Sequence, residues 1–222
     1  MRKKIKISIN GESVEVEKGT SILDAAKQTG VIIPTLCYHK DLCIAGNCRV
    51  CVVEIVGQKR LAPACATPCE DGMDVLTNSF KVRNSRKHII ELLLSEHNTE
   101  CTSCYKNGGC ELQLLASEYK IMNQDFINLV PFHNYTIDMF SPSIIKDDSK
   151  CIRCQRCVRT CAELQGVNAL TMSYKGDHAK VTTFFEKAMN DVVCTNCGQC
   201  VNHCPTGALV ESEPHYFSGS SN

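Results

Sequence analysis

The sequence predicts an α+β chain made of several small domains, on three observations. Residues 3–17 alternate apolar and polar side chains around Asn10 and Gly11, which is the pattern of a β-hairpin. Residues 82–94 and 112–122 carry apolar side chains at helical spacing. The last third of the chain contains two cysteine blocks of identical spacing, CIRCQRCVRTC and CTNCGQCVNHC. Strands, helices and cysteine-rich loops therefore follow one another along the 222 residues.

The composition restricts the class of protein. Because 24 basic residues balance 24 acidic ones, the charge gives no reason to expect a nucleic-acid partner. The chain has 17 cysteines, and its start, MRKKIKISIN, is a strand pattern rather than a signal peptide. The longest apolar run, IIELLL at 89–94, is too short to span a membrane. We expect a soluble chain without a membrane span in a reducing, cytoplasmic compartment.

The N-terminal domain is predicted to be a small sheet crossed by one helix. Ser21 followed by Asp24 resembles a helix cap, and Gly30 is a stop signal, so residues 21–29 should form a short helix. The segments RVCVVEIV and KRLAPAC, on either side of Gly57, are two further expected strands. This arrangement is typical of a β-grasp ferredoxin.

The chemistry of this domain lies in its cysteines, of which a 2Fe-2S cluster needs four. Six are present: Cys37, Cys43, Cys48, Cys51, Cys65 and Cys69. Cys48 and Cys51 form the least ambiguous pair, a CxxC that precedes a strand. Cys43 would complete the plant-type spacing CxxxxCxxC, whereas Cys37 leaves a longer gap. The residues alone leave these alternatives open.

The loop between the two predicted helices carries the pattern HxxxCxxCxxxxxC. Its members are His97, Cys101, Cys104 and Cys110. Three thiolates and one imidazole suit zinc as well as an iron-sulfur cluster, and a histidine at a helix end can also stabilise the helix dipole. Nothing in the loop itself decides among these possibilities.

The doubled block CxxCxxCxxxC is the ligand pattern of two 4Fe-4S clusters, in which the fourth cysteine of each block ligates the other cluster. The first cluster would be held by Cys151, Cys154, Cys157 and Cys204, and the second by Cys194, Cys197, Cys200 and Cys161. Zinc would require two CxxC pairs per ion instead.

Strands are expected in GVNALTM, VTTFF and GALVE, and an ordered connector over 123–150. Arg153, Arg156 and Arg159 could form a docking patch, although a solvated face is the simpler interpretation.

The segment IPTLCYHKDLCIAGNCRVCVVEI, followed by PACATPCEDGM, closely resembles the N-terminal domain of the large peripheral iron-sulfur subunit of respiratory complex I and of iron-only hydrogenases. The resemblance implies that Cys37, Cys48, Cys51 and Cys65 hold the 2Fe-2S cluster. Cys43 and Cys69 would then be apolar fillers or free thiols. The same family carries the histidine loop as a 4Fe-4S site, which implies iron ligation by His97, Cys101, Cys104 and Cys110.

The resemblance covers nearly the whole chain and implies three domains. These are a β-grasp 2Fe-2S domain at 1–80, a helical 4Fe-4S domain with one histidine ligand at 81–140, and a two-4Fe-4S ferredoxin-like domain at 141–222. One 2Fe-2S and three 4Fe-4S clusters would use 15 of the 17 cysteines. Only Cys43 and Cys69 would remain, so no further catalytic metal site and no catalytic residue are expected.

The expected function is that of an electron-transfer subunit. The sequence has no GxGxxG fingerprint and no P-loop, so we expect no nucleotide site and no catalysis by this chain alone. Because the chain stops at Asn222, we expect a stand-alone subunit like those of NAD-linked hydrogenases, NAD(P)-dependent formate dehydrogenases and bifurcating complexes. The resemblance implies a hetero-oligomer with an FMN flavoprotein that oxidises NAD(P)H and with a catalytic subunit. The alternatives are the front fragment of a hydrogenase or formate dehydrogenase polypeptide, and a zinc-binding structural module.

Overall fold

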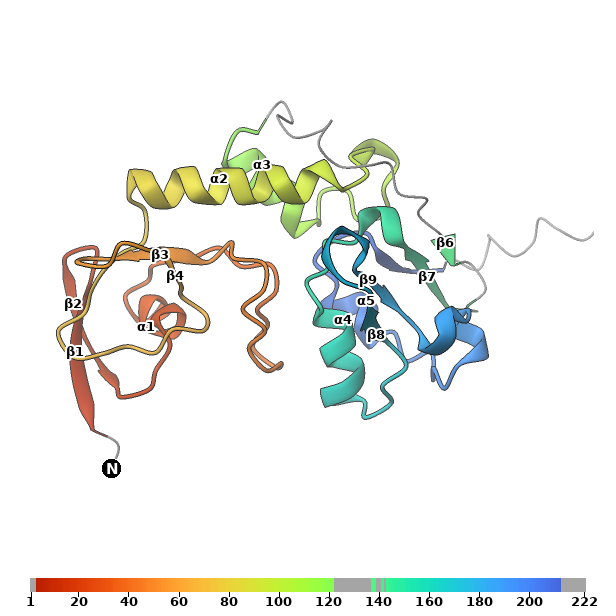
Figure 1. Ribbon diagram of the computed structural model, residues 1–222, viewed down its shortest axis with the longest axis horizontal. Coiled ribbons are helices and arrows are strands. Elements are labelled where there is room, and N and C mark those ends of the chain that lie inside the picture. Colours follow the sequence, from red (N-terminus) through yellow and green to blue (C-terminus); the bar gives the residue numbers. More distant parts are fainter. Residues whose placement is uncertain (1–2, 122–136, 139–140, 142, 213–222) are drawn as a thin grey trace, which may run out of the picture. The chain divides into compact units, whose positions relative to one another are not determined.

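The computed structural model describes residues 3–121, 137–138, 141 and 143–212. The chain divides into two compact units (Figure 1). The first contains residues 1–38 and 44–92, and the second contains residues 39–43 and 93–222. The three-domain division expected from the sequence stays a prediction.

The first unit is organised around a five-stranded sheet in the order β2-β1-β5-β3-β4. Its strands are β1 (Lys4–Ile9), β2 (Glu12–Glu17), β3 (Val52–Ile55), β4 (Ala62–Pro63) and β5 (Asp74–Leu76). The predicted hairpin is confirmed, because β1 and β2 pair antiparallel on either side of Asn10 and Gly11, which both have positive φ. Strand β5 was not predicted. It lies parallel to β1, and local sequence cannot indicate such a distant partner.

Helix α1 (Ile22–Gln28) fills the core of this unit. The Ser21 hydroxyl accepts a hydrogen bond from the Asp24 backbone N–H and donates one to the Asp24 carboxylate, as the capping pattern predicted. Its apolar residues pack with the inward side chains of β1 and with Val53 and Val75. Cys51, Cys65 and Cys69 belong to the same buried cluster, so the core also positions cysteines.

Helix α2 (Phe80–Ser95) confirms the first helix predicted from apolar spacing. Val82 and Ile90 are fully buried. Arg86, 3% exposed, donates a 2.7 Å hydrogen bond to the Val52 carbonyl and so ties α2 to β3. The residues of α2 from Leu93 onward belong to the second unit.

The second unit combines short helices with two small sheets. Its helices are α3 (Glu111–Glu118), α4 (Arg156–Arg159) with a π-helical extension Thr160–Leu164, and α5 (Gln199–His203), and 3-10 turns cover Cys101–Ser103, Asp148–Lys150, Gly176–His178, Phe184–Glu186 and Met189–Asp191. One sheet has the order β10-β7-β6, from β10 (Leu209–Glu211), β7 (Ile144–Asp147) and β6 (Ile137–Asp138), and the other pairs β8 (Thr171–Ser173) with β9 (Lys180–Thr182).

The structure confirms the α+β class and corrects one local expectation. The strands expected in GVNALTM, VTTFF and GALVE overlap β8, β9 and β10. However, β8 shares only Thr171 and Met172 with the first segment, and β9 begins one residue before the second and ends at Thr182. The connector expected over 123–150 lies partly outside the described residues. Its last part was assigned wrongly, because β6 and β7 fall within it and all four residues of β7 are buried. Among the described helices, none has the length and apolarity needed to cross a bilayer.

Candidate iron-sulfur centres

Four cysteines of the first unit lie together: Cys37, Cys48, Cys51 and Cys65. The Cys51 and Cys65 sulfurs are 3.4 Å apart. Hydrogen bonds from Cys48 and Cys65 lower the pKa of the Cys37 thiol, and the same hydrogen bond raises the pKa of Cys48. These opposite shifts mean that deprotonation of one thiol makes deprotonation of its neighbours less favourable. A bound cation relieves this effect, because every thiolate can then remain deprotonated.

The backbone explains how these sulfurs meet. Cys51 lies directly before β3, and Cys65 follows β4, which pairs with β3. The Ala64 N–H donates to the Cys51 carbonyl at 3.0 Å and holds the two strand ends together. Gly46, in the loop before Cys48, has a φ of 62°, and a Cβ there would stand 3.5 Å from the Ala66 Cβ. That distance is an ordinary contact, so the positive φ, and not a lack of space, favours glycine in this turn.

The two other cysteines of this region lie elsewhere. Cys43 belongs to the second unit, where its sulfur lies 2.6 Å from the Glu163 carboxylate and its N–H donates to the same carboxylate at 2.8 Å. The hydrogen bond to Glu163 raises the pKa of Cys43 and engages its sulfur with a carboxylate. Cys69 is packed in the apolar core, where burial raises its pKa to about 11. Both positions fit the expectation of non-ligand thiols.

His97 has a nitrogen suited to metal ligation. Its Nδ1 atom is buried and has no hydrogen-bond partner among the described residues. Burial, assisted by the charge of Lys150, lowers the pKa of His97 to about 4, so the imidazole is neutral at pH 7. A buried nitrogen without a partner costs free energy unless a ligand occupies it. A histidine that only stabilised a helix end would instead be charged.

The cysteines of the histidine loop occupy one short segment. Cys101 begins a 3-10 turn, the Cys104 N–H donates to the Cys101 carbonyl at 3.2 Å, and Cys110 is the residue before α3. Burial raises the pKa of Cys110, and the nearby thiols of Cys104 and Cys101 raise it further. The three sulfurs therefore lie close enough to interact electrostatically.

The paired cysteine blocks line two separate cavities in the second unit. The first cavity is lined by Cys151, Cys154, Cys157 and Cys204, and the second by Cys161, Cys194, Cys197 and Cys200. Apolar side chains, among them Val181 at the first and Met189 at the second, complete the walls. Each cavity thus contains three cysteines of one block and the last cysteine of the other. The spacing predicts the same grouping for the ligands of the two clusters, and that ligation stays a prediction.

The two blocks fold in the same way around their cavities. Arg153 and Gln155 have positive φ in the first block, and Asn196 and Gly198 have positive φ at the equivalent places in the second. Left-handed residues turn the backbone so that its amides point inward. The Arg153 N–H donates to the Cys151 sulfur at 3.4 Å, and the Asn196 N–H donates to the Cys194 sulfur at 3.4 Å.

Burial alone would keep these thiols protonated. It raises the pKa of Cys151 to about 11, and those of Cys154 and Cys200 to about 12. Cys157, which neighbours thiols of both cavities, has its pKa raised well above the usual value. A cluster would bind these residues as thiolates and release their protons. The case for cluster sites therefore rests on the four sulfurs that line each cavity and not on the raised pKa values.

The three arginines of the first block are not a solvated face, and that interpretation was wrong. Arg156 is 4% exposed and forms a bidentate ion pair with Glu111 at 2.6 and 2.9 Å. Arg159 is 8% exposed and donates to the Cys43 carbonyl, and Arg153 pairs with Glu96. These contacts join the cysteine block to α3 and to the segments around residues 43 and 96. The sequence pattern could not predict these contacts, because each arginine and its partner are far apart in the chain.

Gly207 is a site residue that the sequence analysis missed. A Cβ at Gly207 would stand 2.6 Å from the Cys104 sulfur. The neighbouring Pro205 carbonyl accepts a 2.8 Å hydrogen bond from the Glu111 N–H. The loop after Cys204 therefore packs directly on the histidine loop. The sequence around Gly207 could not predict this contact, because Cys104 is distant in the chain.

Models of three protein families match the chain in order. They are a 2Fe-2S iron-sulfur cluster binding domain over residues 2–79, an NADH-ubiquinone oxidoreductase-G iron-sulfur binding region over 86–125, and the ferredoxin-like domain of NADH-quinone oxidoreductase subunit 3 over 141–210. The chain is an iron-sulfur protein. The resemblance inferred from the sequence is confirmed, and so is the presence of both 2Fe-2S and 4Fe-4S binding regions. The number of clusters stays a prediction.

This iron-sulfur protein is similar to subunits of NAD(P)-linked oxidoreductases. It is 49% identical over 218 residues to the NADP-reducing hydrogenase subunit HndD of Solidesulfovibrio fructosivorans, covering 93% of this chain and 36% of that protein. It is 42% identical to the G 2 subunit of the NADH-quinone oxidoreductase of Rhizobium meliloti (strain 1021), covering 96% and 24%. The chain thus spans about a quarter to about a third of these curated relatives.

One solved structure matches nearly the whole chain. It is the crystal structure of an NAD+-reducing [NiFe]-hydrogenase in the H2-reduced state, with a TM-score of 0.86 and 29% sequence identity. The match covers 96% of this chain and 90% of that one. The arrangement of elements found in this iron-sulfur protein therefore also occurs in a hydrogenase chain of similar length.

Proposed function

We propose that this iron-sulfur protein relays single electrons within an NAD(P)-linked oxidoreductase complex. The observation that carries the proposal is the pair of cavities with exchanged cysteines, in which Cys204 completes the first set and Cys161 the second. Two adjoining cluster sites in one small fold are suited to passing electrons. The names of the relatives, a hydrogenase subunit and a quinone oxidoreductase subunit, support this function.

The proposed ligand sets number four. Cys37, Cys48, Cys51 and Cys65 hold a 2Fe-2S cluster; His97, Cys101, Cys104 and Cys110 hold a 4Fe-4S cluster; Cys151, Cys154, Cys157 and Cys204 hold a second, and Cys161, Cys194, Cys197 and Cys200 a third. Contact among the four sulfurs of the first unit, the buried Nδ1 of His97 and the two cavities support these sets. Cys43 and Cys69 are proposed to ligate nothing.

The clusters supply reversible one-electron chemistry when bound. The residues of the chain set the conditions for it. Amide groups such as the Ala169 N–H, 3.2 Å from the Cys161 sulfur, stabilise negative charge on the ligands and so raise the reduction potential. Apolar side chains around the cavities exclude water. The ion pair of Arg156 with Glu111 holds the first cysteine block against the start of α3, which follows the histidine loop.

The proposed partners are a flavoprotein that oxidises NAD(P)H and a catalytic subunit that consumes or supplies the electrons. The support comes from relatives named as a NADP-reducing hydrogenase subunit and as subunit alpha of the NADPH-Fe(3+) oxidoreductase of Geobacter sulfurreducens (strain ATCC 51573 / DSM 12127 / PCA). A cytoplasmic location is part of the proposal, because 17 cysteines that form no disulfide require a reducing compartment.

Anaerobic reduction of the purified, cluster-loaded protein tests the proposal. Dithionite should bleach its visible absorption, whereas NADH, hydrogen or formate alone should not. Adding an NAD(P)H-oxidising flavoprotein isolated from the same native complex should make reduction by NAD(P)H fast. Rapid reduction by NADH, hydrogen or formate of the isolated, flavin-free chain would contradict a relay and require a substrate site within it.

The length of the relatives favours a second possibility, because the match covers only 36% and 24% of them. This chain could in the same way be the front of a longer catalytic polypeptide. The mass of the native polypeptide, measured from the source cells with an antibody against this region, decides between the two. A band near 24.6 kDa supports a separate relay subunit, and a much larger band supports the fused form.

A further inference from the structure

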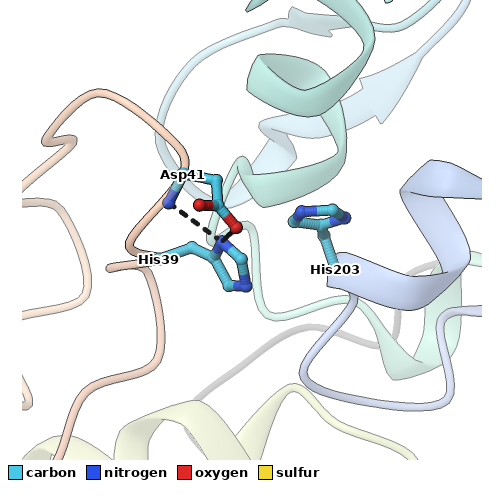
Figure 2. A group of neighbouring side chains, drawn as sticks. All are labelled: His39, Asp41 and His203. Atoms are coloured by element: carbon cyan, nitrogen blue, oxygen red, sulfur yellow. Dashed lines mark hydrogen bonds and ion pairs between the residues drawn. The ribbon is translucent and has the colours of Figure 1, made fainter. Parts of the chain in front are cut away.

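Two histidines and one aspartate outside the cysteine sets converge in the second unit. His39 and Asp41 come from the loop 39–43, and His203 is the last residue of α5; Figure 2 shows the three side chains next to one another. One ligand atom from each lies within 4.8 Å of the other two. The His39 Nδ1 and an Asp41 carboxylate oxygen are 3.7 Å apart, and the two imidazole ring centroids are 4.4 Å apart.

The hydrogen bond of His203 defines which of its nitrogens can bind a ligand. Its Nδ1 lies 2.8 Å from the Gln199 carbonyl oxygen. Because a carbonyl can only accept, Nδ1 must carry the proton, and the neutral imidazole then has its lone pair on Nε2. A ring N–H donated to a backbone carbonyl is the usual support of a metal-binding histidine. His203 is 8% exposed, so this orientation is held by packing as well.

His39 and Asp41 also present acceptors rather than donors. The Asp41 backbone N–H donates to the His39 Nδ1 at 3.4 Å, so this nitrogen is an acceptor, and a cation bound to it would replace that long hydrogen bond (Figure 2). The Asp41 carboxylate oxygen, 3.7 Å from the same nitrogen, is a second acceptor. Two acceptors that lie close together beside the His203 ring are an arrangement that a cation stabilises.

The loop that carries His39 and Asp41 is anchored at its far end. The Cys43 N–H donates to Glu163 at 2.8 Å, and the Cys43 carbonyl accepts from Arg159. Leu42 is buried at 7% exposure, and its N–H donates to the His39 carbonyl. The side chains of His39 and Asp41 are 28% and 48% exposed, so an ion can reach them from solvent. The donors are therefore held in place and accessible.

We propose that His39, Asp41 and His203 bind one divalent transition-metal ion, for which Zn2+ is the best match. Two imidazoles and one carboxylate are zinc ligands, and three protein ligands leave a fourth position for water. Donors around a tetrahedral zinc stand about 3.3 Å apart, given bonds of about 2.0 Å. The three ligand atoms lie within 4.8 Å of one another, so they would have to move closer together on binding. The site uses no cysteine, so zinc binding can be tested whether or not the chain relays electrons.

A bound ion would tether loop 39–43 to α5. His39 follows Cys37 by two residues, and His203 directly precedes Cys204. The ion would therefore restrict two segments that each continue into a proposed cluster ligand. We assign the site a structural role in holding these segments.

Zinc retention by the cluster-loaded protein is the first measurement. The protein is incubated anaerobically with one equivalent of ZnCl2, desalted and analysed for zinc and iron by mass spectrometry. We expect about one zinc per chain with unchanged iron, and at least tenfold less zinc in His203→Ala, His39→Ala and Asp41→Asn. His88→Ala, which removes an exposed histidine of α2, is the matched control and should retain zinc like the wild type.

X-ray absorption at the zinc edge identifies the ligands. We expect nitrogen or oxygen neighbours at about 2.0 Å, without sulfur at about 2.3 Å. Zinc-sulfur scattering accompanied by loss of iron would mean capture by cluster cysteines and would overturn the proposal. Equal retention by the wild type and the three variants would also overturn it. Should His203→Ala lose its clusters, His39→Ala decides, because His39 is a partly exposed loop residue outside the cysteine sets.

Discussion

Gly207 lies directly against Cys104, and a Cβ at Gly207 would stand only 2.6 Å from the Cys104 sulfur. Gly207 has an ordinary φ, so its importance comes from space and not from backbone conformation. The contact joins the loop after Cys204 to the histidine loop. The Cys104 sulfur therefore fits only because residue 207, in the loop after Cys204, has no side chain.

Gly207→Ala should disrupt the site that contains Cys104. The sulfur could rotate away in a chain without a cluster, but a sulfur bonded to iron cannot. We expect a loss of about four iron atoms per chain. Iron analysis and electron paramagnetic resonance measure this loss. Gly109→Ala is the matched control, since a Cβ there meets only the Lys106 carbonyl at 3.9 Å. Equal iron in both variants would mean that Cys104 ligates no iron or that the loop yields freely.

Cys37→Ser should abolish the 2Fe-2S electron paramagnetic resonance signal. Cys37 interacts with Cys48 and Cys65, whereas Cys43 contacts Glu163. Cys43→Ser and Cys69→Ser should therefore leave the signal intact. A signal lost in Cys43→Ser and retained in Cys37→Ser would show that the plant-type spacing holds the cluster.

Replacing His97 should affect one 4Fe-4S cluster. His97→Ala should lose it or convert it, because the buried Nδ1 is the proposed ligand atom. His97→Cys should keep four irons but lower the reduction potential, since a thiolate adds negative charge where a neutral imidazole stood. Redox titration followed by electron paramagnetic resonance distinguishes these cases. Spectra and iron content unchanged in His97→Ala would return His97 to the role of a helix-end residue.

Glu111→Ala should weaken the link between α3 and the first cysteine block. It leaves the guanidinium of Arg156, 4% exposed, without its carboxylate. Removing one partner of a buried pair costs about 3 to 5 kcal/mol. Because the Glu111 side chain is 42% exposed, we expect about 2 kcal/mol. The measurement is the temperature at which visible absorption is lost. Glu118→Ala, an exposed change on the same helix, should leave that temperature unchanged.

The fully loaded protein should contain about 14 iron atoms per chain, two from the 2Fe-2S cluster and four from each of three 4Fe-4S clusters. Anaerobic iron and sulfide analysis of protein purified from its native source checks this value. A content near ten would remove one 4Fe-4S site, and a content near six would remove two.

Local sequence predicted those features whose partners are near neighbours in the chain. The turn at Asn10 and Gly11 and the Ser21 cap depend on residues within a few positions, so their patterns were sufficient. The exchanged cysteines of the two blocks were also predicted, because their spacing is itself a geometric statement. Strand β5 was not, because its pairing with β1 joins Ser8 to Asp74.

The amino-acid sequence by itself determined the order of the cysteine sets, the hairpin, α1 and α2, and the iron-sulfur character of the protein. Only the tertiary structure decided which of the six N-terminal cysteines lie together, since Cys43 contacts Glu163 across 120 positions. It also decided that Arg156 is buried and that His203 lies beside His39. Such contacts form because burial of apolar surface brings distant segments together, and no local periodicity records which side chains then become neighbours.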